Sequence, residues 1–504
     1  MKLRHPSFIL AVSLAICITG VHAQAQNSPS ANPSAPTAPV NSGPGGGYSK
    51  PPAAAARGVD ASLGSQAYDP SQVTPDQNTL AGAELFSVGS LSHARNIFDP
   101  AISVSEIGQT YPGTNGQSQN ISSQSLVGGS LSFDRIWSRY RFSTVYNGGE
   151  TFYAGAYALS SGQASGAGQV PSYTQFQNLV LTQQINWARW HLLLRDDFMA
   201  SPGATFTGTG MGGPGLVAQF SGMLNATLNS LGQVFVPSDT VETGYAMRYR
   251  NAALGQAEYS FSRRAAFTFA GSYGLLHFSN VGYVSSKMLN AQAGYDYLLD
   301  PANSIAILAG YGKVDYTGSS VSTGASTVDY MAALAYGRKV TGHLAFQVAA
   351  GPQQIRSTGG ATGNFMFWFE SVNSALMYTR RRASTSFSFA RGLTSGSGVY
   401  QGATSNTFSG SEGYQFTRFW NGSVNGGYAM NNSLAPAGVA STQFNNWFVG
   451  ATLGRRIGPR GQINFNYGLQ KQSSPANCPV TSCGLAGYQQ SFGMTLGWHL
   501  RPTG

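Results

Sequence analysis

The stretch GYQQSFGMTLGWHLRPTG, residues 487–504, decides the fold. Every second position carries a large side chain, and all but one of these are apolar or aromatic: Tyr488, Gln490, Phe492, Met494, Leu496, Trp498 and Leu500. The intervening residues, from Gln489 to His499, are small or polar. A repeat of two residues is typical of a β-strand whose two faces meet different surroundings. The composition of the whole chain indicates what those surroundings are.

The chain is poor in charge for its length. Only 10% of its 504 residues are charged, against roughly 25% in a typical soluble protein. It contains 64 Gly, 25 Tyr and 28 Phe, and no window of about 18 apolar residues follows its start, which excludes a helical membrane protein. A chain rich in Gly and aromatic residues, with too few charges to cover a soluble surface, predicts an all-β fold. We expect a transmembrane antiparallel β-barrel.

The alternation recurs from about residue 95 to the end, and the connections between the expected strands alternate in length. The short ones are 262–265, 300–303, 340–343, 379–382 and 458–461, and the long ones are 314–326, 355–363, 431–441 and 473–486. Short turns at one end and long loops at the other are typical of outer-membrane barrels, which have an even number of strands. With a weak first strand near 101–108, the count is about 18. Sixteen is the alternative, because the segment 394–418 is ambiguous.

The amino terminus predicts export from the cytoplasm. Residues 1–23 combine Lys2 and Arg4 with an apolar run and a Val-His-Ala cleavage sequence, which indicates a secretory signal peptide. Residues 24–78 are rich in Pro, Ala, Ser and Gly and predict a disordered tether. The barrel is therefore expected within residues 79–504.

The closing strand also resembles a known signal. In SFGMTLGW, Ser491, Gly493, Leu496 and Trp498 match the polar, glycine, apolar and aromatic positions of the outer-membrane assembly signal, although six residues follow the aromatic. The resemblance is to porin-like bacterial outer-membrane β-barrel proteins as a class, and it covers roughly residues 95–500. It implies a place in the bacterial outer membrane, contact with the lipid there, and recognition by the barrel-assembly machinery.

Strand parity places several charged side chains inside the barrel. The expected inward bases are Arg139, Arg141, Arg195, Arg248 and Arg250, and the expected inward acids are Asp134, Asp197, Glu242, Glu258, Asp296 and Asp329. One interpretation is that these charges face water, pair locally and play no part in selectivity. The other is a basic inner wall that raises the local concentration of anions. The net charge of +10 does not decide between them, because much of it falls in the short turns, where Arg and Lys would anchor to headgroups.

Two longer connections carry further predictions. Residues 203–238 contain an apolar stripe at helical spacing, formed by Leu216, Val217, Phe220, Leu224, Leu228 and Leu231. This segment resembles the porin loop that folds into the barrel and narrows it; an external cap or a subunit contact is the alternative. Cys478 and Cys483 lie close together in another long loop, and an exported chain passes through an oxidising compartment. We expect them to form a disulfide.

The sequence gives no sign of an enzyme, a metal site or a cofactor. Its histidines are scattered, and none is paired with a nucleophile in a recognisable motif. Nucleic-acid binding is also excluded, because no element combines a basic face with interleaved aromatic residues. Three functions remain: a passive, anion-leaning channel for small hydrophilic solutes, an export barrel for an anionic exopolysaccharide, or a non-conducting structural or adhesive barrel. The sequence leaves open whether the barrel forms a homo-oligomer.

Overall fold

The computed structural model describes most of the chain from Arg95 onwards. The described range is 95–500 apart from 112–119, 137–138, 155–172, 203–246, 263, 280–282, 301, 319–324, 361–362, 381, 395–400, 436–440, 442, 459 and 474–486. The predicted signal peptide and tether, residues 1–23 and 24–78, lie outside it.

Eighteen strands make up the regular structure of this range. The first nine are β1 (Arg95–Tyr111), β2 (Asn120–Ile136), β3 (Tyr140–Ala154), β4 (Tyr173–Asn186), β5 (Trp190–Pro202), β6 (Met247–Ser260), β7 (Ala265–Phe278), β8 (Ser285–Asp300) and β9 (Asn303–Thr317). The second nine are β10 (Ser326–Lys339), β11 (Leu344–Gly360), β12 (Gly363–Arg380), β13 (Ala383–Thr394), β14 (Ala403–Gln415), β15 (Trp420–Ser433), β16 (Gln443–Ile457), β17 (Gly461–Ser473) and β18 (Gly487–His499).

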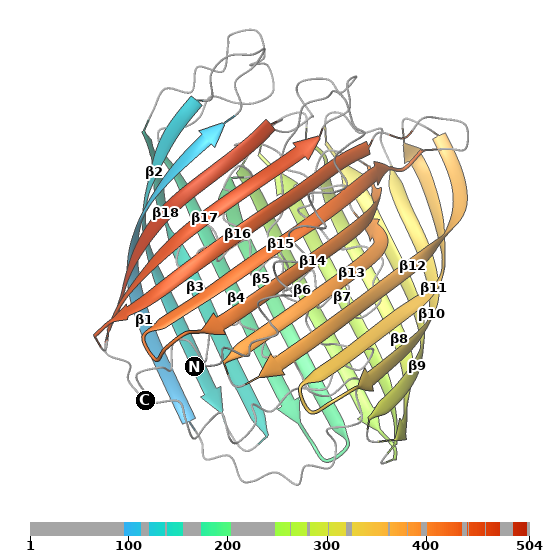
Figure 1. The fold of residues 1–504 in the computed structure, drawn as a ribbon. Helices are drawn as coiled ribbons and strands as arrows, with labels where there is room; N and C mark the ends of the chain where they lie inside the picture. Colours follow the sequence, from blue (N-terminus) through green and yellow to red (C-terminus); the bar gives the residue numbers. More distant parts are fainter. Residues whose placement is uncertain are drawn as a thin grey trace, which may run out of the picture.

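The strands form one closed antiparallel sheet (Figure 1). Each strand pairs with its neighbours in the sequence, and β1 closes the ring by pairing with β18, from Ala101 opposite His499 to Thr110 opposite Gln490. The predicted barrel and the count of 18 are therefore confirmed, and the alternative of 16 is wrong. The weak strand expected near 101–108 is the central part of β1, and the ambiguous segment 394–418 contributes the end of β13, all of β14 and the turn after it.

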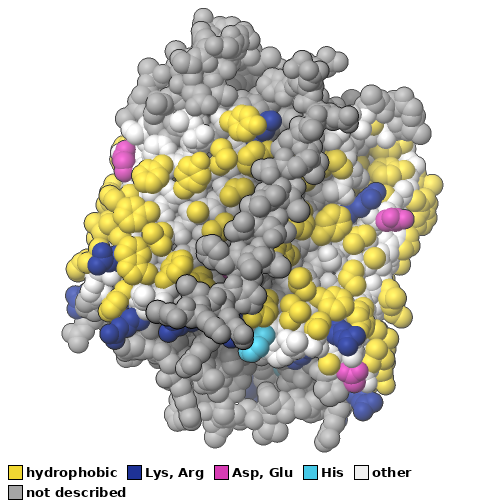
Figure 2. Space-filling model, in the orientation of Figure 1, with side chains coloured by type: hydrophobic (Ala, Val, Ile, Leu, Met, Phe, Trp, Pro, Cys, Tyr) yellow, Lys and Arg dark blue, Asp and Glu magenta, His cyan; other side chains and the backbone are white. Residues whose placement is uncertain are grey.

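The alternation of the closing strand separates the inside of the barrel from the outside. On β18 the small residues Ser491, Gly493 and Thr495 are buried, whereas Phe492 is 61% exposed and Leu496 is 50% exposed. Strands β6 to β10 repeat this pattern, with buried and exposed positions in turn. Figure 2 shows the result as a wall covered with hydrophobic side chains, with Lys and Arg gathered mostly toward its lower edge. This outer face matches the surroundings that lipid provides.

Aromatic rings gather on the outer face next to the short turns. Trp190 packs on Tyr259 with ring centroids 4.8 Å apart, and Phe267 packs on Tyr295 at 5.3 Å. On the other side of the barrel the Arg455 guanidinium lies over the Trp420 ring, 5.1 Å from its centroid. Aromatic and basic side chains at this position form the girdle expected at a membrane–water interface.

The connections confirm most of the predicted turns and correct one. The short segments 262–265, 300–303, 340–343, 379–382 and 458–461 all lie where two strands meet at the same end of the barrel. The segment 355–363, expected to be a long loop, is instead mostly strand, because β11 continues to Gly360 and β12 begins at Gly363. Gly359 (φ +71°) and Gly363 (φ +79°) adopt left-handed backbone conformations that allow this tight reversal. The Gly-rich composition of this segment predicted a long loop, but its glycines instead supply the backbone geometry of a tight turn.

Candidate functional site

The inner wall of β5 and β6 carries the best-defined cluster of charged side chains in the described range. Both strands are antiparallel neighbours, with Asp197 opposite Ala252 and Met199 opposite Arg250. Every second residue on each strand faces inward, which directs Arg195, Asp197 and Arg250 to the same side. We call these three residues the arginine cluster. It places a carboxylate between two guanidinium groups.

The arginine cluster is held by short ionic contacts. Arg195 Nη2 lies 3.6 Å from Asp197 Oδ2, and Arg250 Nη2 lies 4.0 Å from Asp197 Oδ1. The side chains of Asp197 and Arg250 are 1% exposed, and that of Arg195 is 11% exposed. Two positive charges share one negative charge, so the cluster carries an excess of one positive charge. Buried charges keep much of their mutual interaction, because little solvent screens them.

Arg248 extends this basic region toward the long-loop end of the barrel. It lies two residues before Arg250 on β6, opposite Ser201 of β5, and it is 9% exposed. Arg195, Arg250 and Arg248 therefore follow one another along the inner wall. Their predicted inward direction is confirmed, while their role in selectivity stays a prediction.

The other two predicted arginines lie elsewhere. Arg141 faces inward at the short-turn end of β3, where its Nε lies 3.2 Å from Asp134 Oδ1 and its Nη2 donates to Asp134 Oδ2 over 3.3 Å. Arg139 precedes β3, in the turn after β2, and its side chain is exposed. Because β3 begins one residue later, the structure does not place Arg139 in the wall, and its inward direction stays a prediction. The five arginines do not form one continuous wall.

The inward acids lie where parity places them. Asp134, Asp197, Glu258, Asp296 and Asp329 are all at most 4% exposed, and Glu242 lies outside the described residues. Thr268 of β7 lies opposite Glu258 and donates a hydrogen bond of 2.8 Å to Asp296 Oδ2. Asp134, Glu258 and Asp296 lie in the short-turn half of their strands, whereas Asp329 lies near the long-loop end of β10. The three arginines of β5 and β6 lie in the middle and toward the long-loop end.

A second part of the inner wall is apolar, which the alternation did not predict. The buried members of this inner apolar cluster are Val284, Met288, Ala306, Leu308, Val314, Tyr316, Ala325, Met331, Ala333, Ala335, Ile355 and Leu393. Phe367, Phe369 and Leu434 pack against it. The small and polar inward face of the closing strand is therefore not repeated on these strands. On β9, for example, Leu308 faces inward and Ile307 outward, so both faces of the strand are apolar.

The inner apolar cluster joins strands that are not neighbours in the sheet. Tyr316 is the last residue but one of β9, whereas Gly402 precedes β14, and a Cβ added to Gly402 would lie 2.8 Å from Tyr316 Oη. It would also lie 2.7 Å from Leu434 Cδ1. Gly402, whose φ is +91°, therefore allows β9 and the residue after β15 to meet inside the barrel. This contact narrows the long-loop end on that side.

Comparison with known structures gives matches at low sequence identity. The outer membrane protein OpdK from Pseudomonas aeruginosa is 9% identical with a TM-score of 0.37, covering 81% of this chain and 99% of its own. OpdQ from the same species is 7% identical with a TM-score of 0.39, over 81% and 98%. A BenF-like porin from Pseudomonas fluorescens Pf-5 is 8% identical with a TM-score of 0.38, over 82% and 100%. No protein-family model and no curated protein matches the sequence.

The strand order and register of the chain itself decide the assignment. Eighteen antiparallel strands close between β1 and β18, with an apolar outer face and rings of aromatic residues. The chain has a porin-like barrel fold. Within this porin-like barrel, Ser491 and Gly493 of the predicted assembly signal face inward, and Leu496 and Trp498 face outward. The recognition of that signal by assembly machinery stays a prediction.

Several predicted site residues lie outside the described part of the porin-like barrel. They are the helical stripe of Leu216, Val217, Phe220, Leu224, Leu228 and Leu231, and the cysteine pair Cys478 and Cys483. The constriction helix and the disulfide therefore stay predictions. Among the residues that the structure describes, three or more His, Cys, Asp or Glu side chains nowhere gather as they would to hold a metal ion. No helix within the same residues is long and apolar enough to cross a membrane.

Proposed function

We propose that the chain forms a passive channel for small hydrophilic solutes in the bacterial outer membrane, with a preference for anions. A closed barrel with an apolar outer wall satisfies its backbone hydrogen bonds within lipid. Its inner wall on β5 and β6 carries charged and polar side chains on the face turned away from lipid. The signal peptide predicted over residues 1–23 is consistent with this location.

The arginine cluster is the observation that carries the preference for anions. Its two guanidinium groups outnumber the single carboxylate of Asp197, and Arg248 adds a further positive charge two residues away. A local excess of positive charge in a low-dielectric wall raises the concentration of anions beside it. The acids near the short-turn end, and Asp329 in the long-loop half, oppose this effect, so we expect a moderate preference.

A non-conducting barrel is the second candidate, favoured by the inner apolar cluster. Its buried residues join β8, β9 and β10 to Leu393 and Leu434 across the interior. Apolar packing there narrows the space available to water. The inward arginines also leave the export of an anionic polymer as a prediction.

The preference for anions is tested by the reversal potential of the refolded protein in a planar bilayer under a salt gradient. Replacing Arg248 and Arg250 by Gln removes inner-wall charge, and the anion-to-cation permeability ratio should fall. The matched control replaces Arg338 and Arg356 by Gln, because both side chains are exposed on the outer face. The effect should weaken near 1 M salt, where the screening length falls to about 3 Å. Equal permeability ratios in wild type and both variants would refute the preference for anions.

A further inference from the structure

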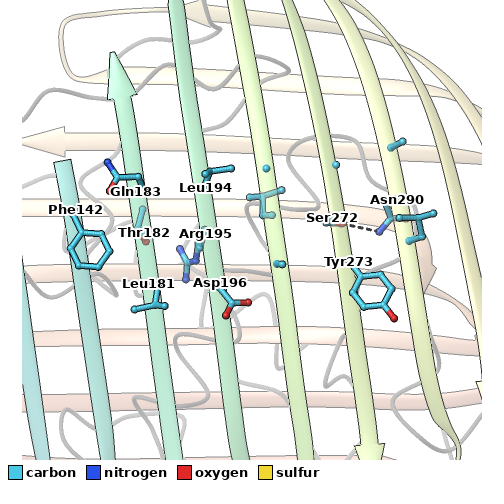
Figure 3. A pocket seen from close by; sticks show the side chains of 16 residues that line it. Phe142, Leu181, Thr182, Gln183, Leu194, Arg195, Asp196, Ser272, Tyr273 and Asn290 are labelled. Atoms are coloured by element: carbon cyan, nitrogen blue, oxygen red, sulfur yellow. Dashed lines mark hydrogen bonds between the residues drawn. The ribbon is translucent and has the colours of Figure 1, made fainter. Parts of the chain in front are cut away.

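The outer wall of the barrel contains a hollow over β3 to β8. Its volume is about 670 Å³. Across three neighbouring strands its floor consists of small residues at one level, because Gly255 of β6 lies opposite Gly271 of β7, which lies opposite Ala291 of β8. Larger outward side chains rise around this floor: Phe142, Leu181, Leu194, Tyr273 and Leu289 (Figure 3). We call this feature the outer hollow.

The floor of the outer hollow has room for added atoms. A Cβ at Gly255 would meet Leu194 Cδ2 at 3.6 Å, and a Cβ at Gly271 would meet the Asn290 carbonyl oxygen at 3.6 Å. Both distances are ordinary van der Waals contacts. The glycines are therefore not required by the packing of the barrel, although they keep its outer surface low at this place. Small residues that let two surfaces approach closely are typical of contacts between membrane-spanning elements.

A polar pair stands at the rim of the outer hollow, at mid-height on the wall. Asp196 is the central outward residue of β5, and its Oδ1 accepts a hydrogen bond of 3.1 Å from Asn251 Nδ2 of β6. Gln183 of β4, also outward, lines the same hollow. A carboxylate facing lipid at this depth is unfavourable, and polar residues in membranes usually turn toward protein or water. One hydrogen bond leaves most of the acceptor capacity of Asp196 unused.

We propose that the outer hollow is the contact surface for a second copy of this chain. A two-fold axis brings the same patch of both copies together, so the patch must complement itself. The hollow satisfies this condition because its lining holds both an acceptor, the Asp196 carboxylate, and an amide donor, Gln183. The same axis lets Leu194 and Tyr273 of one copy enter the small-residue floor of the other. An acyl chain of a lipid would fill the floor but would give the Asp196 carboxylate no donor beyond Asn251 of its own chain.

The proposal is tested by disulfide crosslinking between copies. Ala253, which lines the outer hollow and is exposed, is replaced by Cys in a chain whose Cys478 and Cys483 are both replaced by Ser. The matched control carries Val424→Cys, because Val424 is 54% exposed on the outer face of β15, away from the hollow. In vesicles at a low protein-to-lipid ratio, oxidation should give a crosslinked dimer on the order of tenfold more efficiently at Ala253 than at Val424. Equal crosslinking at the two sites would overturn the proposal.

A second variant distinguishes between two roles for the hollow, a contact between copies and a lipid-binding site. Gly255→Trp places a ring in the hollow at a position where an added Cβ makes only an ordinary van der Waals contact, and Val449→Trp adds the same ring to the outer face of β16. Native mass spectrometry should give a dimer for wild type and Val449→Trp, and a monomer for Gly255→Trp. Unheated electrophoresis shows that each variant is a folded barrel. A wild-type monomer that retains lipid, or a dimer that survives Gly255→Trp, would refute the contact. Neither result bears on conduction, so the proposal fails or holds independently of the channel.

Discussion

Asp197 holds two arginines together inside the barrel, and replacing it should destabilise the fold more than replacing either partner. Its oxygens lie 3.6 Å from Arg195 Nη2 and 4.0 Å from Arg250 Nη2, so each pair is worth about 4 kcal/mol at an effective dielectric constant of 20. Repulsion between the two guanidinium groups offsets part of this sum. Asp197→Asn keeps the shape of the side chain but removes the negative charge that lies between the two guanidinium groups. The free energy of unfolding should fall by about 3–5 kcal/mol, the cost of breaking a buried ion pair.

The effect is measured by urea unfolding of the barrel from lipid vesicles, followed by tryptophan fluorescence. Arg250→Gln serves as the comparison, because Asp197 still pairs with Arg195, and we expect it to lose less stability than Asp197→Asn. The double variant should be more stable than Asp197→Asn alone, since the repulsion between the two guanidinium groups has been removed. A loss of less than about 1 kcal/mol for Asp197→Asn would refute the reasoning, since that is the range of a solvent-exposed pair.

Two further predictions concern topology and packing. On intact cells, an impermeant maleimide should label a cysteine at position 436, in the predicted long loop 431–441, but not one at Ala302 in the turn 300–303; both are placed in a chain whose other cysteines are Ser. The opposite labelling pattern would show that the orientation of the barrel in the membrane is the reverse of the predicted one. Gly351→Ala should lower the free energy of unfolding in urea by about 1–3 kcal/mol, because the added Cβ would overlap the Ala332 carbonyl oxygen of the neighbouring strand. Gly392→Ala, where a Cβ meets nothing within 4 Å, is its control, and equal losses would contradict the expected clash.

The fold could be predicted because period-two alternation is strong wherever one face of a strand is bulky and the other small. The closing strand is the clearest case, with Phe492 and Leu496 outside and Ser491 and Thr495 inside. At β1 the signal is weaker, so the expected segment 101–108 covers only part of the observed Arg95–Tyr111. The closure of the barrel follows from the need to pair every backbone group in lipid. The pattern of one strand cannot show this closure, but the composition of the whole chain implies it.

The candidate site was only partly predictable from the sequence. Parity gave the direction of Arg195 and Arg250, but their shared contact with Asp197 depends on the register between β5 and β6, strands separated by residues 203–246. Alternation also reports only which face is bulkier. It therefore missed the inner apolar cluster, where Leu308 and Ile307 make both faces of β9 apolar. The position of Arg139 just before β3 could not be predicted, because a strand end cannot be located to one residue from its pattern.

Single-channel recording on the refolded full-length protein in a planar bilayer tests the central claim most directly. A closed barrel that conducts should insert as discrete, stable current steps at 1 M salt, with an open-state current proportional to salt concentration. Protein that migrates as a folded barrel in unheated electrophoresis, and enters the bilayer without any current steps, would contradict the channel.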